Sequence, residues 1–131
     1  MLDYQTYYAS IVKPFFAPEP WVFGVAWGII YPLIALAGLY LLILWWRRSV
    51  PLYLVFVFAA NLAANLAFTP LQLGMPETIL PTLDILVVLG TLAYFEYRIL
   101  RYSRVIFWLL VPYLLWGTFA TVLQLSILFL N

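Results

Sequence analysis

The sequence predicts an all-α integral membrane protein, a helical bundle with four transmembrane helices in a single membrane domain over residues 1–131. Hydrophobic residues make up 67% of the chain and charged residues 8%, whereas soluble domains average about 45–50% apolar and about 25% charged residues. Four apolar runs also reach the roughly 20 residues that a helix needs to span a bilayer. These runs cover residues 21–46, 51–73, 79–97 and 105–130.

The arginines supply the third observation, because they give the bundle an orientation. All five fall in loops 47–50 and 98–104, while the turn "GMPET" between the two middle spans carries Glu77 and no positive charge. Positively charged loops tend to stay in the cytoplasm, so we expect both arginine loops to be cytoplasmic and both chain termini to lie outside.

Composition excludes several classes of function. The chain has no Cys and no His, which excludes disulfides, thiolate chemistry and the usual zinc, copper and haem ligands. No catalytic motif is recognisable, so we expect no required cofactor and no metal site, and a binding role is favoured over an enzymatic one. A net charge of +1 with arginines confined to two loops also argues against nucleic-acid binding.

The first 20 residues are expected to form an interfacial lid or belt segment. "YYASIVKPFFAPEP" is too short to cross the bilayer and is interrupted by three prolines, yet its aromatic residues suit the membrane interface. The start "MLDYQTYYAS" lacks the basic start and apolar core of a signal peptide, so we interpret it as mature protein.

The first two spans carry stripes of small, aromatic and amide residues. At 100° per residue, one side of the first span gathers Gly24, Trp27, Gly28, Tyr31, Ala35 and Gly38. The second span has a small-residue face and a neighbouring ridge, made by Ala60, Ala63, Ala64 and Ala67 and by Asn61, Asn65 and Phe68 respectively. Two amides one turn apart in lipid are expected to point inward.

Two acids in the third span have different expected roles. Asp84 is the acid best placed to enter the membrane, where an ionisable group is a functional candidate. "PTLD" also places it in the expected first turn of a helix, where a carboxylate stabilises the positive end of the helix dipole; both interpretations stay open. Glu96, beside the second arginine loop, is expected to be a solvated interfacial charge.

The last span has its polar and aromatic residues on one face. Within one arc of roughly 100° lie Tyr113, Trp116, Gly117, Ala120 and Gln124. These stripes have two interpretations: close helix packing with amides bonded across helices, at about 0.6 kcal/mol each, or a pocket with aromatic walls and a few polar groups.

Four segments together resemble the translocator protein family, also called tryptophan-rich sensory proteins or TspO/MBR. They are "KPFFAPEPWVFGVAWGIIY" (13–31), "NLAANLAFTPLQLG" (61–74), "LDIL" (83–86) and "PYLLWGTFATVLQL" (112–125). Their order and spacing match the family, and the resemblance covers nearly the whole chain.

The resemblance implies a ligand pocket closed by the loop before the first of these spans. Members of that family are five-helix membrane bundles that bind porphyrins, sterols or synthetic hydrophobic ligands. With the stripes, it nominates as ligand-binding residues Trp27, Tyr31, Asn61, Asn65, Asp84, Tyr113, Trp116, Ala120 and Gln124. It likewise nominates as lid residues Lys13, Pro14, Phe16 and Pro18.

The chain departs from the family pattern in several places. The family's first span has no counterpart, which should expose small-residue faces and favour a homo-oligomer such as a dimer. Phe68 replaces a tryptophan, Gln72 and Leu73 replace paired phenylalanines, and Gln124 replaces an asparagine. The end "LSILFLN" lacks the Tyr and basic residue of the proposed sterol pattern, so we do not extend sterol recognition to this chain.

Three hypotheses for function follow. The first is a receptor-like or transporter-like binder of flat hydrophobic ligands, with porphyrin, including haem, as the expected ligand, in a prokaryotic plasma membrane. The second is a structural subunit that assembles through its small-residue faces. The third is an enzyme for light- or oxygen-dependent porphyrin breakdown, with Trp116 as the redox-active aromatic.

Overall fold

The computed structural model describes residues 3–76 and 78–131, so Glu77 in the predicted outer turn lies outside the described residues. The described part folds into helices α1 (Tyr4–Ser10), α2 (Pro20–Trp46), α3 (Leu52–Gly74), α4 (Leu80–Ile99) and α5 (Arg104–Leu130). Helices α2 to α5 are each long and apolar enough to cross a membrane. The predicted all-α bundle of four membrane helices is therefore confirmed, and the chain is an integral multi-pass membrane protein.

The short helix α1 lies inside the segment expected to form a lid, and the sequence patterns did not predict it. Its N-cap is Asp3, whose carboxylate accepts hydrogen bonds from the Thr6 amide at 2.8 Å and from the Thr6 hydroxyl at 2.9 Å. Both bonds favour the ionised carboxylate and lower the pKa of Asp3. The cap therefore fixes the start of a helix that has only seven residues.

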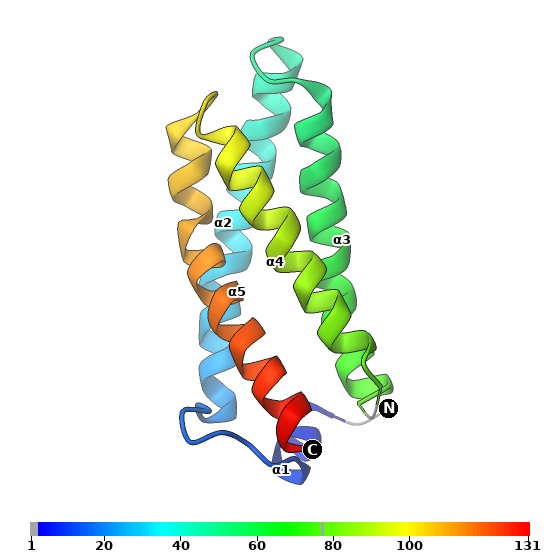
Figure 1. Ribbon diagram of the computed structural model, residues 1–131. Coiled ribbons are helices and arrows are strands. Elements are labelled where there is room, and N and C mark those ends of the chain that lie inside the picture. The colour runs from blue at the N-terminus through cyan, green and yellow to red at the C-terminus, as the bar shows by residue number, and fades with distance from the viewer. Residues whose placement is uncertain (1–2, 77) are drawn as a thin grey trace.

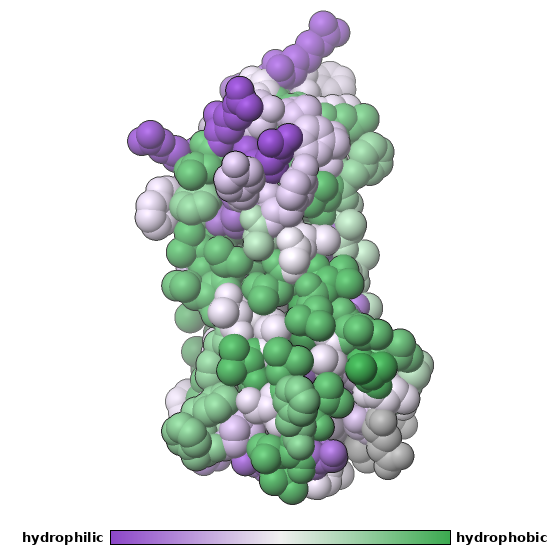
Figure 2. Space-filling model, in the orientation of Figure 1, coloured by the Kyte–Doolittle hydropathy of each residue, from purple (hydrophilic) through white to green (hydrophobic). Residues whose placement is uncertain are grey.

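The two ends of the bundle differ in chemistry (Figure 1). The end that holds the α2–α3 and α4–α5 connections contains all five arginines, and we call it the arginine end. The opposite end holds α1 and the C-terminal end of α5, and we call it the lid end. Figure 2 shows the strongly hydrophilic groups gathered at the arginine end and an apolar surface along the flank of the bundle, as a lipid-facing surface requires.

The helices surround the core in the order α2, α5, α4, α3, and three of the four neighbouring pairs pack closely. Helices α2 and α3 touch at far fewer positions. One such position is Gly38, where an added Cβ would lie 3.0 Å from the Phe58 ring. The weakly packed line between α2 and α3 is called the α2–α3 seam below.

The arginine half of the bundle is filled by side chains that are at most 1% exposed. They include Leu41, Leu54, Leu92, Phe95, Ile99, Ile106 and Leu110. Because this half is close-packed, the space for a ligand is at the other end.

The expected environment of Glu96 was wrong, and so was the expected place of Asp84 in the first turn of its helix. Glu96 is 2% exposed, and neither carboxylate oxygen has a hydrogen-bond partner among the described residues. It lies one turn from Leu92 and Ile99, which face the core, so helical periodicity turns it inward despite the nearby arginines. Asp84 lies in the second turn of α4 and not the first, because the helix already begins at Leu80.

Candidate ligand-binding site

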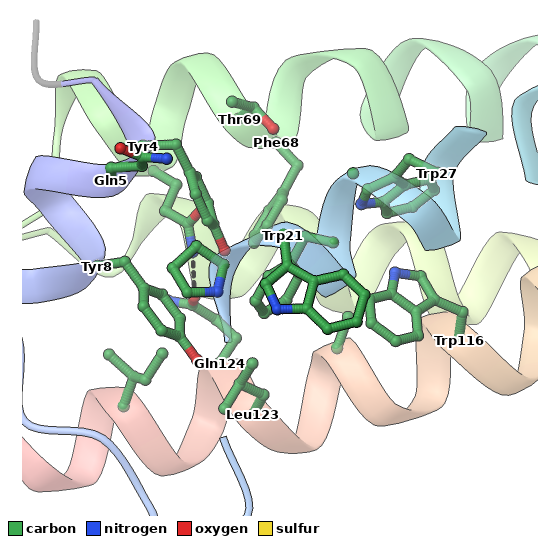
Figure 3. Close-up of a pocket in the computed structure, with 16 residues that line it drawn as sticks. Tyr4, Gln5, Tyr8, Trp21, Trp27, Phe68, Thr69, Trp116, Leu123 and Gln124 are labelled. Carbon is green, nitrogen blue, oxygen red and sulfur yellow. Dashed lines mark hydrogen bonds between the residues drawn. The ribbon is translucent and has the colours of Figure 1, made fainter. Parts of the chain in front are cut away.

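A cavity of about 390 Å³ opens at the lid end between α1, α2, α3 and α5, and Figure 3 shows its walls. Helices α1 and α2 contribute Tyr4, Gln5, Tyr8, Pro20, Trp21, Phe23, Gly24 and Trp27. Helices α3 and α5 contribute Phe68, Thr69, Gln72, Trp116, Ala120, Leu123, Gln124 and Ile127. This volume falls in the range of ligand pockets, about 300–1,000 Å³.

Aromatic rings form most of the cavity wall. Figure 3 shows the indoles of Trp27 and Trp116 at one end and the rings of Tyr4 and Tyr8 at the other. Phe23 links the two groups, because its ring lies 5.6 Å from Trp116 and 5.5 Å from Tyr4, both edge-on. These contacts hold the rings in fixed orientations, which suits the stacking of a flat ligand.

The glycine in the wall explains part of the cavity's shape. Gly24 lines the space, and a Cβ built on it would meet nothing within 4 Å. One turn further along α2, Gly28 is equally open. Gly24 therefore leaves room in the cavity wall, and no other helix in the described part of the chain packs against either glycine.

Polar groups enter the cavity from α3 and α5. The Gln72 amide donates to Gln124 Oε1 at 3.0 Å (Figure 3), and the Gln124 amide donates to Thr82 Oγ1 of α4 at 3.2 Å. The indole Nε1–H of Trp116 is buried without a hydrogen-bond partner in the part of the chain described. Because a buried donor without a partner is costly, a rotation of the indole that brings Nε1–H to a ligand acceptor in the cavity would add a hydrogen bond.

A hydrogen-bonded chain lies below the cavity and joins four helices. Tyr31 of α2 donates to Asn65 Oδ1, the Asn65 amide donates to the Tyr113 hydroxyl, and that hydroxyl donates to Asn61 Oδ1, each at 2.8 Å. Asn61 in turn donates to the Val88 carbonyl at 2.8 Å and to Thr91 at 2.9 Å on α4. This chain is called the polar floor below.

A smaller cavity of about 140 Å³ adjoins the main one on the side of the α2–α3 seam. The two cavities share Trp27, Phe68 and Thr69, and the smaller one is also lined by Tyr31 and Asn65 of the polar floor. The Trp27 ring stacks on Tyr31 at 5.1 Å. A rotation of Trp27 or Phe68 would therefore join the two spaces.

Hydrogen bonds and ring contacts fix the position of the loop between α1 and α2. The Tyr8 hydroxyl donates to the Pro18 carbonyl, and the side-chain amide of Asn131 pairs with both backbone groups of Val12, at 3.0 and 2.9 Å. Phe16 meets Phe119 of α5 edge-on at 6.2 Å. These contacts hold the loop between α1 and α2 against α1 and the end of α5.

Burial changes the acidity of the lid tyrosines. It raises the pKa of Tyr4 and, to a smaller extent, that of Tyr8, whose pKa is raised further by the charge of Glu19. Both hydroxyls therefore stay protonated at neutral pH and can donate hydrogen bonds into or around the cavity.

The residues that the sequence nominated occupy three positions. Trp27, Trp116, Ala120 and Gln124 line the main cavity, while Tyr31 and Asn65 line the smaller one. Asn61 and Tyr113 complete the polar floor. Asp84 lines neither cavity, and its Oδ2 atom is buried without a partner among residues 3–76 and 78–131.

The nominated lid residues stabilise the loop between α1 and α2 and do not line the cavity. Lys13 donates to the Tyr8 carbonyl at 2.7 Å, Pro14 accepts from the Ala17 amide at 3.1 Å, and Pro18 accepts from Tyr8. The wall itself comes from α1, whose contribution sequence reasoning missed. The repeated tyrosines of "YQTYYAS" with a capping Asp one residue earlier were the available signal.

The cavity walls offer stacking and hydrogen bonding, without a set of residues suited to a metal. Within the described ranges, no group of three or more acidic residues could hold a metal ion. The arrangement can therefore bind a flat apolar molecule by its faces and orient it by a few polar atoms.

Comparisons of this sequence with a family model and with known proteins agree on one family. The model of the TspO/MBR family matches residues 2–130. The chain is 35% identical to the tryptophan-rich protein TspO of Archaeoglobus fulgidus, over 97% of this chain and 81% of that protein. It is 30% identical to the tryptophan-rich sensory protein of Cereibacter sphaeroides, over 100% and 80%. It is 32% identical to the translocator protein of Homo sapiens, over 90% and 70%.

Proposed function

This chain belongs to the TspO/MBR family, and from that premise we propose that its lid-end cavity binds flat hydrophobic small molecules, porphyrins above all. The observation that carries the proposal is the aromatic cavity with a buried Trp116 Nε1–H that has no hydrogen-bond partner among the described residues. Similarity to proteins named as a sensory protein and a translocator supports a binding role in the membrane.

The ligand's ring would stack on Trp116 and Trp27, which line the same end of the cavity. An acceptor on its edge would pair with Trp116 Nε1–H, and the amide of Gln124 would orient a second polar edge. The chain has no His and no Cys, so an iron atom would gain no axial ligand of those types. Metal-free porphyrin should therefore bind as tightly as haem.

The test is a titration of protoporphyrin into the purified protein in nanodiscs, followed by porphyrin absorbance and fluorescence. Trp116→Phe removes the indole donor and part of the stacking surface, so we expect about tenfold weaker binding, or about 1.4 kcal/mol. Trp46→Phe is the matched control, because Trp46 is 80% exposed at the arginine end. Partitioning that never saturates, or equal binding by both variants, would contradict the proposed function.

A second function, assembly of identical copies, has one structural observation in its favour. Ala60 and Ala63 are exposed on the outer face of α3, and small residues at such positions let transmembrane helices approach closely. We propose a homodimer through this face. Cysteine substitution at Ala63 should give a defined crosslinked dimer in nanodiscs, while a ladder of larger species would oppose a specific interface.

The orientation is also part of the proposal. The arginine end would face the cytoplasm of a prokaryotic cell and the lid would face outward, because arginine-rich loops are retained inside. Cysteine accessibility at Ser10 and Ser49 in intact cells tests this, since the two positions lie at opposite ends of the bundle. Labelling of Ser49→Cys alone from outside would reverse the orientation.

A further inference from the structure

The part of the cavity wall that the described residues form is polar in places but carries no charge. None of the 16 residues that line it is an acid or a base, and its hydrogen-bonding groups are hydroxyls, amides and indoles. Porphyrins such as protoporphyrin carry two carboxylates on one edge. A carboxylate that enters a buried site without a cationic partner loses its hydration and gains little in return.

The one cation near the cavity in the described part of the chain is already engaged. Lys13 Nζ donates to the carbonyl of Tyr8 at 2.7 Å and to that of Ile11 at 3.3 Å, and it lies 4.9 Å from the Tyr8 ring centroid. The five arginines are at the opposite end of the bundle. Lys13 therefore stabilises the lid, and its charge is not directed into the cavity.

The fixed negative charges near the cavity work against an anionic ligand. Asp3 precedes α1, and Glu19 directly precedes Pro20 of the cavity wall. Helix dipoles do not reverse this balance, because the lid end has the positive N-termini of α2 and α4 beside the negative C-termini of α3 and α5.

We propose that the cavity selects neutral ligands, so that a flat ring with masked carboxylates binds more tightly than the same ring with free carboxylates. The inference rests on the proposed function and narrows its ligand class. A free diacid would be confined to poses in which both carboxylates reach water at the lid. A neutral diester could instead place either edge against Trp116 and Gln124.

The experiment compares protoporphyrin with its dimethyl ester in nanodiscs of neutral lipid. Partition of each ligand into protein-free nanodiscs is measured first, so that affinities refer to ligand in the bilayer. We expect the diester to bind at least tenfold more tightly than the diacid, about 1.4 kcal/mol, with Trp116→Phe weakening both. A diacid that binds as tightly as the diester overturns the inference but leaves the proposed function intact.

Two variants test the electrostatic cause. Glu19 makes no side-chain cap bond, so Glu19→Lys can reverse the charge beside the cavity without removing a contact to the helix. It should strengthen diacid binding at least threefold and leave diester binding within twofold. The gain for the diacid should disappear at about 1 M salt, where the Debye length is about 3 Å. Lys13→Met removes two hydrogen bonds that brace the loop, so it should weaken diacid and diester binding by the same factor; a loss confined to the diacid would show that Lys13 pairs with the carboxylates and would overturn the inference. Failure of either ligand to saturate would remove the proposed function and this inference together.

Discussion

Removal of the Tyr113 hydroxyl tests whether the polar floor holds the bundle together. Tyr113 is 1% exposed, and its hydroxyl accepts from Asn65 and donates to Asn61, each at 2.8 Å. Tyr113→Phe keeps the ring but leaves two buried amide groups without these partners. Interhelical hydrogen bonds in membranes average about 0.6 kcal/mol each, while an unpaired buried polar group costs about 1–3 kcal/mol. We expect the free energy of unfolding to fall by about 1–3 kcal/mol.

The assay is reversible unfolding from mixed micelles, followed by circular dichroism. Tyr53→Phe is the matched control, because it makes the same chemical change at an exposed hydroxyl that accepts from Arg98 Nε at 3.1 Å. It should cost less than about 0.5 kcal/mol. In an Asn65→Leu background, Tyr113→Phe should cost at least about 0.5 kcal/mol less than alone. Equal losses in the two tyrosine variants, together with strict additivity, would refute a cooperative floor.

Three further substitutions or conditions probe other parts of the molecule. Gly38→Ala should leave the stability within about 1 kcal/mol, because the helix propensity that alanine gains, about 1 kcal/mol, offsets the small shift that the Phe58 ring must make away from a Cβ at 3.0 Å; a loss of about 3 kcal/mol, as in an overpacked core, would contradict this. Glu96→Leu should stabilise the bundle by about 1 kcal/mol or more, because it removes a buried carboxyl that has no partner within residues 3–76 and 78–131, and a loss of stability would reveal an unrecognised role. Burial raises the pKa of Tyr4 and Tyr8, so the lid should stay docked below pH about 10, the ordinary tyrosine value, and loosen as pH rises further. Porphyrin release at alkaline pH measures this, and release that begins near neutrality would oppose it.

Much of the bundle could be predicted because lipid imposes strong rules on sequence. Length and apolar composition located all four spans, since every backbone polar group in the bilayer must be bonded within a helix. The inward direction of Asn61 and Asn65 also followed from the cost of exposing amides to lipid, and both are buried. The same rules say little about short interfacial segments such as α1, where water and lipid compete as solvents.

The candidate site was harder to predict because a stripe on one helix does not show what faces it. Trp116 and Trp27 were nominated from their own helices and line one cavity. Phe23 was missed, although it contacts Trp116 and both wall tyrosines of α1, because its role depends on α1. Glu96 was misassigned because its nearness in sequence to arginines was weighed above its position on the core face of α4.

The polar and aromatic residues of α5 serve two purposes that require each other. A cavity in a membrane bundle separates helices that would otherwise pack, and the α2–α3 seam is the weakly packed side of this one. The bond from Tyr31 to Asn65 crosses that seam directly below the cavity, and Tyr113 of α5 continues it to the far wall. Trp116, one turn closer to the lid end, has an indole donor without a partner in the described part of the chain, and a ligand acceptor would supply one. The hydrogen bonds of the polar floor thus offset the helix-packing energy that is lost where the cavity separates the helices. Variants of Tyr113 should therefore lose stability, whereas variants of Trp116 should lose affinity for the ligand.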